Sequence, residues 1–155
     1  MEEKIGGELT VSFPEGFRRM TDGEMKKLNR LEEGPGIFMT DPERHIIVTV
    51  GWKRIALFAS LLLSAKDIAK NAGGQIARAM KPYGCRGPEY TERTVAGARA
   101  HGFRYAYTAE SVPMEAETCV LKRGRVVLYF NFYAREALKE ESFSVWKSIL
   151  ASVRP

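Results

Sequence analysis

Apolar and polar residues alternate most clearly between Arg99 and Tyr133, where three runs are rich in aromatic and β-branched residues. These runs are HGFRYAYT (101–108), MEAETCVL (114–121) and RVVLYFNFY (125–133), with turn signals at Val112-Pro113 and Arg123-Gly124. In the third run, apolar residues occupy every second position from 126 to 132. Since successive side chains of a strand point to opposite faces, this spacing predicts a meander that forms the centre of the domain.

Two segments carry helix-start signals of the capping-box type. Thr21 with Glu24 opens one helix, with Met20 and Met25 as a hydrophobic staple, and Gly34-Pro35-Gly36 is expected to end it. Ser64 with Asp67 opens the second, which continues as an apolar stripe before Pro82 and Gly84 end it: Ile68, Ala72, Ile76 and Met80. Gly73-Gly74 lies within that helix, and close approach to the sheet would explain why two glycines are tolerated there.

The remaining segments complete an α+β pattern. Further strands are predicted over 8–13, 36–40, 44–54 and 90–95, with Ala96-Gly97 as a tight turn. Trp52 lies on the more apolar face of its strand, and that face should meet the core. A final helix has one apolar face: Phe143, Trp146, Ile149, Leu150 and Val153. The order strand–helix–strand–strand–helix–four strands–helix predicts a single α+β domain over residues 1–155, with helices packed on a mainly antiparallel sheet.

Composition places the chain among ordinary globular domains, with 45% hydrophobic and 28% charged residues in 155. The net charge of +5 is spread along the sequence, and no RNP-like motif accompanies the aromatic strands, so nucleic-acid binding is not expected. Cys85 and Cys119 suggest free thiols, although their pairing stays open. The most apolar window, Ile55 to Leu63, is about half a membrane span. We expect a cytoplasmic protein; an exported or lipid-anchored form whose leader has been removed is the alternative.

Candidate chemistry is sparse. His45 and His101 lack the spacing of a metal site, and Glu115 with Glu117 share a strand face that is expected to be solvated. No G-x-S-x-G, G-x-G-x-x-G or P-loop motif occurs. We therefore expect no catalytic residues, no metal and no cofactor. The predicted contact points are the densest basic cluster, at a hairpin tip, and one strand-face histidine: Lys122, Arg123, Arg125 and His101.

The order of these segments resembles the Mog/PsbP-like superfamily. LTVSFPEGF (9–17) is similar to its opening strand followed by Pro-x-Gly-aromatic, and ILASV (149–153) is similar to its closing helix. The capped helix from Thr21, the hairpin to Trp52, LSAKD (63–67) and the Val95-Ala96-Gly97 turn lie where that family has them, and the likeness is greatest to the bacterial DcrB-like branch. The resemblance implies a three-layer α/β/α sandwich without an active site, whose members act by binding; it transfers no functional residue.

Two functional hypotheses follow from these observations. The first is a non-catalytic protein-binding, adaptor or chaperone-like domain of unknown partner, with a homodimer as one arrangement. The second is a small-ligand-binding domain with a pocket between the sheet and a helix, where Arg99, His101 or Tyr133 would converge. An enzyme that uses Glu115, Glu117 or His101 is the least favoured reading.

Overall fold

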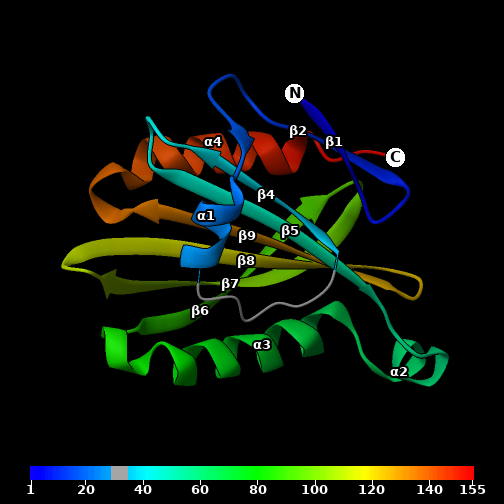
Figure 1. Ribbon diagram of the computed structural model, residues 1–155. Helices are drawn as coiled ribbons and strands as arrows, with labels where there is room; N and C mark the ends of the chain where they lie inside the picture. Colours follow the sequence, from blue (N-terminus) through cyan, green and yellow to red (C-terminus); the bar gives the residue numbers. More distant parts are fainter. Residues whose placement is uncertain (29–34) are drawn as a thin grey trace.

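The computed structural model describes residues 1–28 and 35–155 and is built around a seven-stranded antiparallel sheet (Figure 1). The predicted α+β class is confirmed, and the meander lies within the sheet. In spatial order the strands are β3 (Arg18–Arg19), β4 (Gly36–Asp41), β5 (Ile46–Arg54), β9 (Val126–Arg135), β8 (Val112–Arg123), β7 (Ala98–Ala109) and β6 (Arg86–Val95). Every neighbouring pair is antiparallel.

Helices cover both faces of this sheet, which gives the three layers that the resemblance implied (Figure 1). Helix α4 (Lys139–Ala151) packs on one face, and α3 (Ala65–Ala79) packs on the other, over β6, β7 and β8. The shorter elements are α1 (Asp22–Lys27), α2 (Leu57–Leu62) and the 3₁₀ turns η1 (Lys81–Tyr83) and η2 (Glu136–Leu138). A separate hairpin of β1 (Glu2–Ile5) and β2 (Leu9–Ser12) lies beside α4; β1 was not predicted.

The α4 side holds the main apolar core. The predicted helix face is confirmed, because Phe143, Trp146 and Ile149 are all buried against strand residues such as Phe132. The Trp146 and Phe132 rings stack with centroids 5.2 Å apart, and Phe143 meets Phe132 edge-on at 5.0 Å. Burying large aromatic side chains contributes roughly 2–3 kcal/mol each, so this layer dominates the stability of the fold.

The α3 side is built on aromatic residues of β7. The predicted capping box of Ser64 with Asp67 is present, and the apolar stripe of α3 packs on Phe103 and Tyr105. A Cβ atom added at Gly73 would lie 3.0 Å from the Tyr90 hydroxyl and 3.3 Å from Phe103. The predicted close approach of this helix to the sheet is therefore confirmed at Gly73.

Several boundaries differ from the predictions; β6, for example, begins at Arg86 and not at residue 90. Val112 and Pro113 begin β8, and the preceding turn is formed by Glu110 and Ser111, which both have positive φ. That left-handed conformation is expected of glycine or asparagine, so a Glu-Ser turn carries no strong sequence signal. The first helix is also shorter than predicted, because α1 gives way to extended backbone at Leu28. The expected stop at Gly34-Pro35-Gly36 lies partly outside the described residues.

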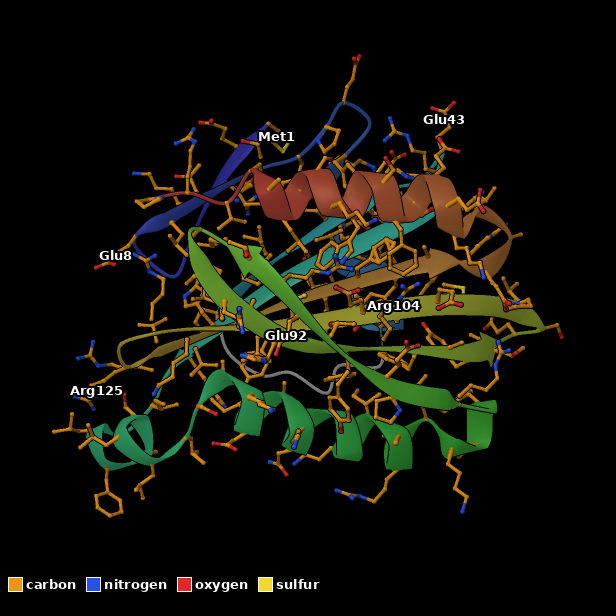
Figure 2. All side chains as sticks on the ribbon, turned by 180° about the vertical axis from the view of Figure 1, so that it is seen from behind. Met1, Glu8, Glu43, Glu92, Arg104 and Arg125 are labelled. Carbon is orange, nitrogen blue, oxygen red and sulfur yellow. The ribbon has the colours of Figure 1, made fainter. Side chains whose placement is uncertain are left out.

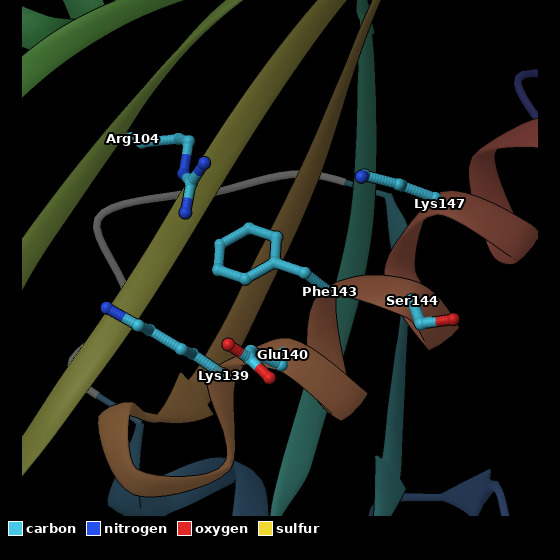
Figure 3. Close-up of a pocket in the computed structure, with 6 residues that line it drawn as sticks. All are labelled: Arg104, Lys139, Glu140, Phe143, Ser144 and Lys147. Carbon is cyan, nitrogen blue, oxygen red and sulfur yellow. The ribbon is translucent and has the colours of Figure 1, made fainter.

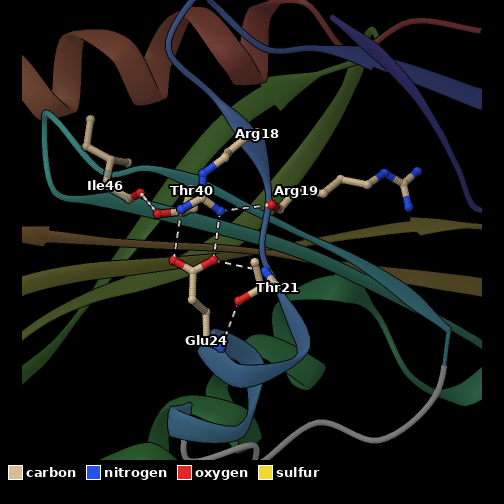
Figure 4. A network of polar contacts seen from close by, with 6 residues as sticks. All are labelled: Arg18, Arg19, Thr21, Glu24, Thr40 and Ile46. Atoms are coloured by element: carbon tan, nitrogen blue, oxygen red, sulfur yellow. Dashed lines mark hydrogen bonds and ion pairs between the residues drawn. The ribbon is translucent and has the colours of Figure 1, made fainter.

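The start of α1 confirms its predicted capping box (Figure 4). The Thr21 hydroxyl accepts a hydrogen bond from the Glu24 amide at 3.2 Å, and the Glu24 carboxylate accepts one from the Thr21 amide at 2.9 Å. Arg18 adds two hydrogen bonds to the same carboxylate, and these hydrogen bonds lower the pKa of Glu24 to about 2. Met20 is buried, which is consistent with the predicted staple.

The two ends of the chain are joined by hydrogen bonds. Thr10 in β2 forms an antiparallel bridge with Arg154, with N–O distances of 2.7 and 3.0 Å. The Ser152 hydroxyl accepts a hydrogen bond from the Ser12 amide at 2.9 Å. The β1–β2 hairpin is thus held against the C-terminal end of α4, where the two termini lie near each other in Figure 1.

Candidate partner-binding surface

Helix α2 presents its large apolar side chains to solvent. Leu57, Phe58, Leu61 and Leu62 are 60–76% exposed, and Leu63, which follows the helix, is 44% exposed. No residue of α2 is buried. We call these five residues the apolar cap. Contiguous apolar surface of this kind is uncommon on soluble domains and typically marks a site of interaction.

The orientation of α2 is inverted relative to an ordinary amphipathic helix. Positions 57, 58, 61 and 62 share one side of a helix, and that side is apolar and points outward. The partly buried residues of α2 are Ala59 and Ser60. The Ser60 hydroxyl donates a hydrogen bond to the Gly124 carbonyl at 2.9 Å. The small residues therefore take the inner side, and the bulky ones are left in water.

The basic hairpin tip between β8 and β9 holds α2 in this orientation. Lys122 donates through its ammonium group to the Ser60 carbonyl. Arg125 donates through Nε to the Ile55 carbonyl at 3.0 Å, and its own carbonyl accepts from the Ile55 amide at 2.8 Å. In Figure 2, Arg125 lies close to α2 at the same end of the molecule. Two of the four predicted contact residues, Lys122 and Arg125, thus contact the α2 segment, whereas Arg123 points to the opposite face of the sheet.

Three cations lie on the side of the sheet that carries the apolar cap: Lys53, Lys122 and Arg125. Lys53 and Lys122 both pair with Val127 of β9, so they point to the same face of the sheet, the one toward α3; Arg54 and Arg123 both pair with Val126 and point to the other face. On that other face, Arg123 lies 3.9 Å from the largely exposed carboxylate of Glu8. A cationic border around an apolar centre favours a partner of opposite charge.

His101, the fourth predicted contact residue, lies elsewhere, on the α3 side of β7. It borders a cavity of about 270 Å³ lined by Lys66, Ala69, Lys70, Tyr90, Thr91, Glu92, His101 and Gly102. Its Nδ1 atom is 3.7 Å from the Glu92 carboxylate, which is also 3.5 Å from Arg99. The cavity lies between α3 and the sheet, where the small-ligand hypothesis expected a pocket, and His101 lines it whereas Arg99 and Tyr133 do not.

Glu117 was expected on a solvated face, and that expectation is wrong. Its side chain is fully buried beneath α4 and accepts two hydrogen bonds from Arg93, at 2.5 and 2.7 Å. The Trp146 indole and the Cys119 thiol each donate to the same carboxylate at 3.1 Å. Burial opposes ionisation, but these hydrogen bonds and the charge of Arg93 hold the pKa of Glu117 below its ordinary value.

Of the groups named for a hypothetical enzyme, His101 lies on the opposite side of the sheet from Glu115 and Glu117. Glu117 contacts α4, whereas His101 borders the cavity on the α3 side. Cys85 and Cys119 are free thiols, and burial raises the pKa of both, which disfavours a reactive thiolate. Among the described residues, no cluster of His, Cys, Asp or Glu has the arrangement of a metal site.

The apolar cap is the feature that the sequence analysis missed. The run from Ile55 to Leu63 was noted only as too short for a membrane span. Over the described residues, no helix is both long and apolar enough to cross a bilayer. The helical spacing of the leucines opposite Ser60 could have predicted a two-sided helix. Periodicity does not show which of the two sides meets the protein, so it could not predict that the apolar side of α2 faces solvent.

No family model and no curated protein matches the sequence. Solved structures do match over nearly the whole chain. Cyanobacterial PsbP (CyanoP) from Synechocystis sp. PCC 6803 superposes with a TM-score of 0.66 and 13% identity, covering 99% of this chain and 91% of that one. The Saccharomyces cerevisiae Ran-binding protein Mog1p gives 0.61 and 11%, with 99% and 94% covered. LpqN, involved in cell envelope biogenesis of Mycobacterium tuberculosis, gives 0.59 and 15%, with 94% and 82% covered. The chain has the Mog/PsbP-like fold.

Proposed function

We propose that this protein is a non-catalytic protein-binding domain that docks its partner through the apolar cap on α2. The observation that carries the proposal is the outward orientation of Leu57, Phe58, Leu61 and Leu62, fixed by hydrogen bonds between α2 and the hairpin tip. Aromatic and apolar side chains at the centre of an interface commonly provide most of its binding energy. A protein of this fold, yeast Mog1p, is a Ran-binding protein, which supports a binding role.

The partner we infer is a protein with an apolar groove bordered by carboxylates. Lys53, Lys122 and Arg125 would face those carboxylates while the apolar cap fills the groove. A second copy of this chain fits less well, because a two-fold contact through the cap would place the same cationic borders against each other. The basic border would also raise the association rate with an acidic surface.

Photo-crosslinking in the source cell can identify the partner. A crosslinking amino acid is placed at position 58 or 61, with position 148 on the exposed side of α4 as the control. We expect one acidic protein to be captured from positions 58 and 61 and not from 148. The captured protein is then purified, and its affinity for the full chain is measured by calorimetry.

Matched variants test whether the cap itself binds. Phe58→Ser and Leu61→Ser should each weaken the purified pair by about tenfold or more. Lys53→Glu should slow association and reduce its salt dependence. Leu138→Ser, an exposed leucine in η2, is the control and should leave binding unchanged. Binding of the chain to anionic phospholipid vesicles instead, or a dimer abolished by Leu61→Ser, would contradict the proposal.

A further inference from the structure

A second cavity lies between β7 and α4, on the side of the sheet opposite to the cavity that His101 borders (Figure 3). It is a cavity of about 420 Å³, lined by Arg104, Lys139, Glu140, Phe143, Ser144 and Lys147. This volume falls within the range of small-molecule sites. Three cations against one carboxylate give the lining a net charge of about +2. Arg104 is labelled in Figure 2 at the sheet beneath α4.

Arg104 is held in place by contacts that leave its hydrogen-bond donors available. Its guanidinium carbon lies 4.0 Å from the centroid of the Phe143 ring. Its Nε atom is 4.0 Å from the Glu117 carboxylate, too far for a hydrogen bond. Within the described part of the chain, no hydrogen bond from this guanidinium is recorded, although its side chain is only 38% exposed.

The charge of Glu117 does not satisfy Arg104. Both oxygens of that carboxylate are taken by the two hydrogen bonds from Arg93, with Trp146 and Cys119 as further donors. Arg93 and Glu117 therefore neutralise each other, and Arg104 stays as an additional cation at the edge of this buried pair. Because the guanidinium is partly exposed, its donors face solvent in the open cavity, and an anionic acceptor can replace that water through charge-assisted hydrogen bonds.

Helix α4 adds two lysines with the matching placement. Lys139, Phe143 and Lys147 follow one another at intervals of four residues, so they share one side of the helix. In Figure 3 the two lysines extend on either side of the Phe143 ring, whereas Ser144 is turned away. No ion pair among the described residues, at a limit of 4.0 Å, joins either lysine to a carboxylate. The charges of both lysines are therefore also available to a ligand.

We propose that this cavity, the Arg104 site, binds a phosphate group carried by a small molecule or as the free ion. The planar fork of Arg104 would donate two hydrogen bonds to phosphate oxygens, and Lys139 and Lys147 would add charge from α4. A dianionic phosphate matches the net charge of about +2. The cavity leaves room beyond the phosphate for an organic part of the ligand. The inference is independent of the apolar cap.

Titration of the full chain with inorganic phosphate tests the site. Amide shifts in nuclear magnetic resonance spectra should change saturably around Arg104 and along residues 139–147, and not with chloride at equal ionic strength. Phenyl phosphate distinguishes the two sources of the group: tighter binding than phosphate indicates an organic phosphate, and equal binding indicates the free ion. Shifts no larger than those with chloride would overturn the proposal.

Single-residue variants test whether phosphate binds at the Arg104 site. Arg104→Gln should weaken phosphate binding by about tenfold, and Arg104→Lys should weaken it less because the charge stays and the fork is lost. Lys147→Gln, at an exposed position that leaves the fold intact, should weaken it several-fold. Arg99→Gln is the control, since Arg99 lies on the same strand but on the opposite face. Equal binding by wild type, Arg104→Gln and Lys147→Gln would refute the site.

Discussion

Helices α4 and α2 are both rich in large apolar residues, yet five residues of α4 are buried and none of α2 is. In α4 the apolar face lies on the sheet, with Trp146 stacked on Phe132. In α2 the apolar face is turned away, because Ser60 and the hairpin tip at Gly124 fix the inner side. Apolar content therefore does not decide burial by itself: polar contacts on one side of a short helix can direct the other side to solvent.

Among variants that compare α4 with α2, Trp146→Ala should have the largest effect on the free energy of unfolding. The substitution removes the ring stacked on Phe132, leaves a cavity and removes one donor to Glu117. We expect a loss of about 3–5 kcal/mol in the free energy of unfolding, measured by urea denaturation. A loss below about 1 kcal/mol would show that the α4 layer is not the main core.

The buried carboxylate of Glu117 should make the stability of the fold depend on pH. Because the folded pKa of Glu117 is lowered, its contribution is present above its unfolded pKa of about 4.3 and is lost as the pH falls through the folded value. Glu117→Gln should cost about 3 kcal/mol at pH 7, since it leaves Arg93 unpaired, and should flatten the fall in stability below about pH 4. Urea unfolding between pH 3 and 7 measures both effects. An unchanged acid slope would contradict the role assigned to this pair.

Adjacent glycines in α3 should respond with opposite signs. Gly73→Ala places a methyl group 3.0–3.3 Å from Tyr90 and Phe103, so we expect destabilisation of about 1–3 kcal/mol. At Gly74 the nearest atom is Nη1 of the flexible Arg78 side chain, 3.7 Å away. Gly74→Ala should therefore stabilise the fold by up to about 1 kcal/mol through helix propensity. Thermal unfolding of both variants under one condition makes the comparison.

The smallest effect on stability is expected at the apolar cap. Phe58→Ser and Leu61→Ser remove exposed side chains, so each should change the free energy of unfolding by no more than about 0.5 kcal/mol. Urea denaturation of these variants beside Trp146→Ala completes the comparison of α2 with α4. If Phe58→Ser cost as much as a core substitution, α2 would be packed in solution, and its role as a binding surface would be lost.

The features that could be predicted from sequence are local ones. The capping boxes at Thr21 and Ser64 and the apolar face of α4 depend on residues within one helix, and all three are present. The DcrB-like branch, the cytoplasmic location and a homodimer stay predictions. The resemblance to the Mog/PsbP-like superfamily rested on the order of such segments, and the fold agrees with it.

The features that escaped prediction depend on residues far apart in the chain. The orientation of α2 rests on a hydrogen bond between Ser60 and Gly124, 64 positions apart. The burial of Glu117 rests on Arg93 and Trp146, 24 and 29 positions away. Such contacts exist only once the sheet has formed, so the sequence near each residue does not show which side of the element meets the protein.

The bridge between Thr10 and Arg154 has a consequence for how the protein is made. Contacts between residues 140 or more positions apart, such as Ser12 with Ser152, cannot form on the ribosome until the last helix has emerged. Until then, β5 and β9 lack the α4 layer that covers Phe132 and its neighbours. We expect the nascent domain to stay open until α4 has left the ribosome, and to close slowly because many of its contacts join residues far apart in the chain.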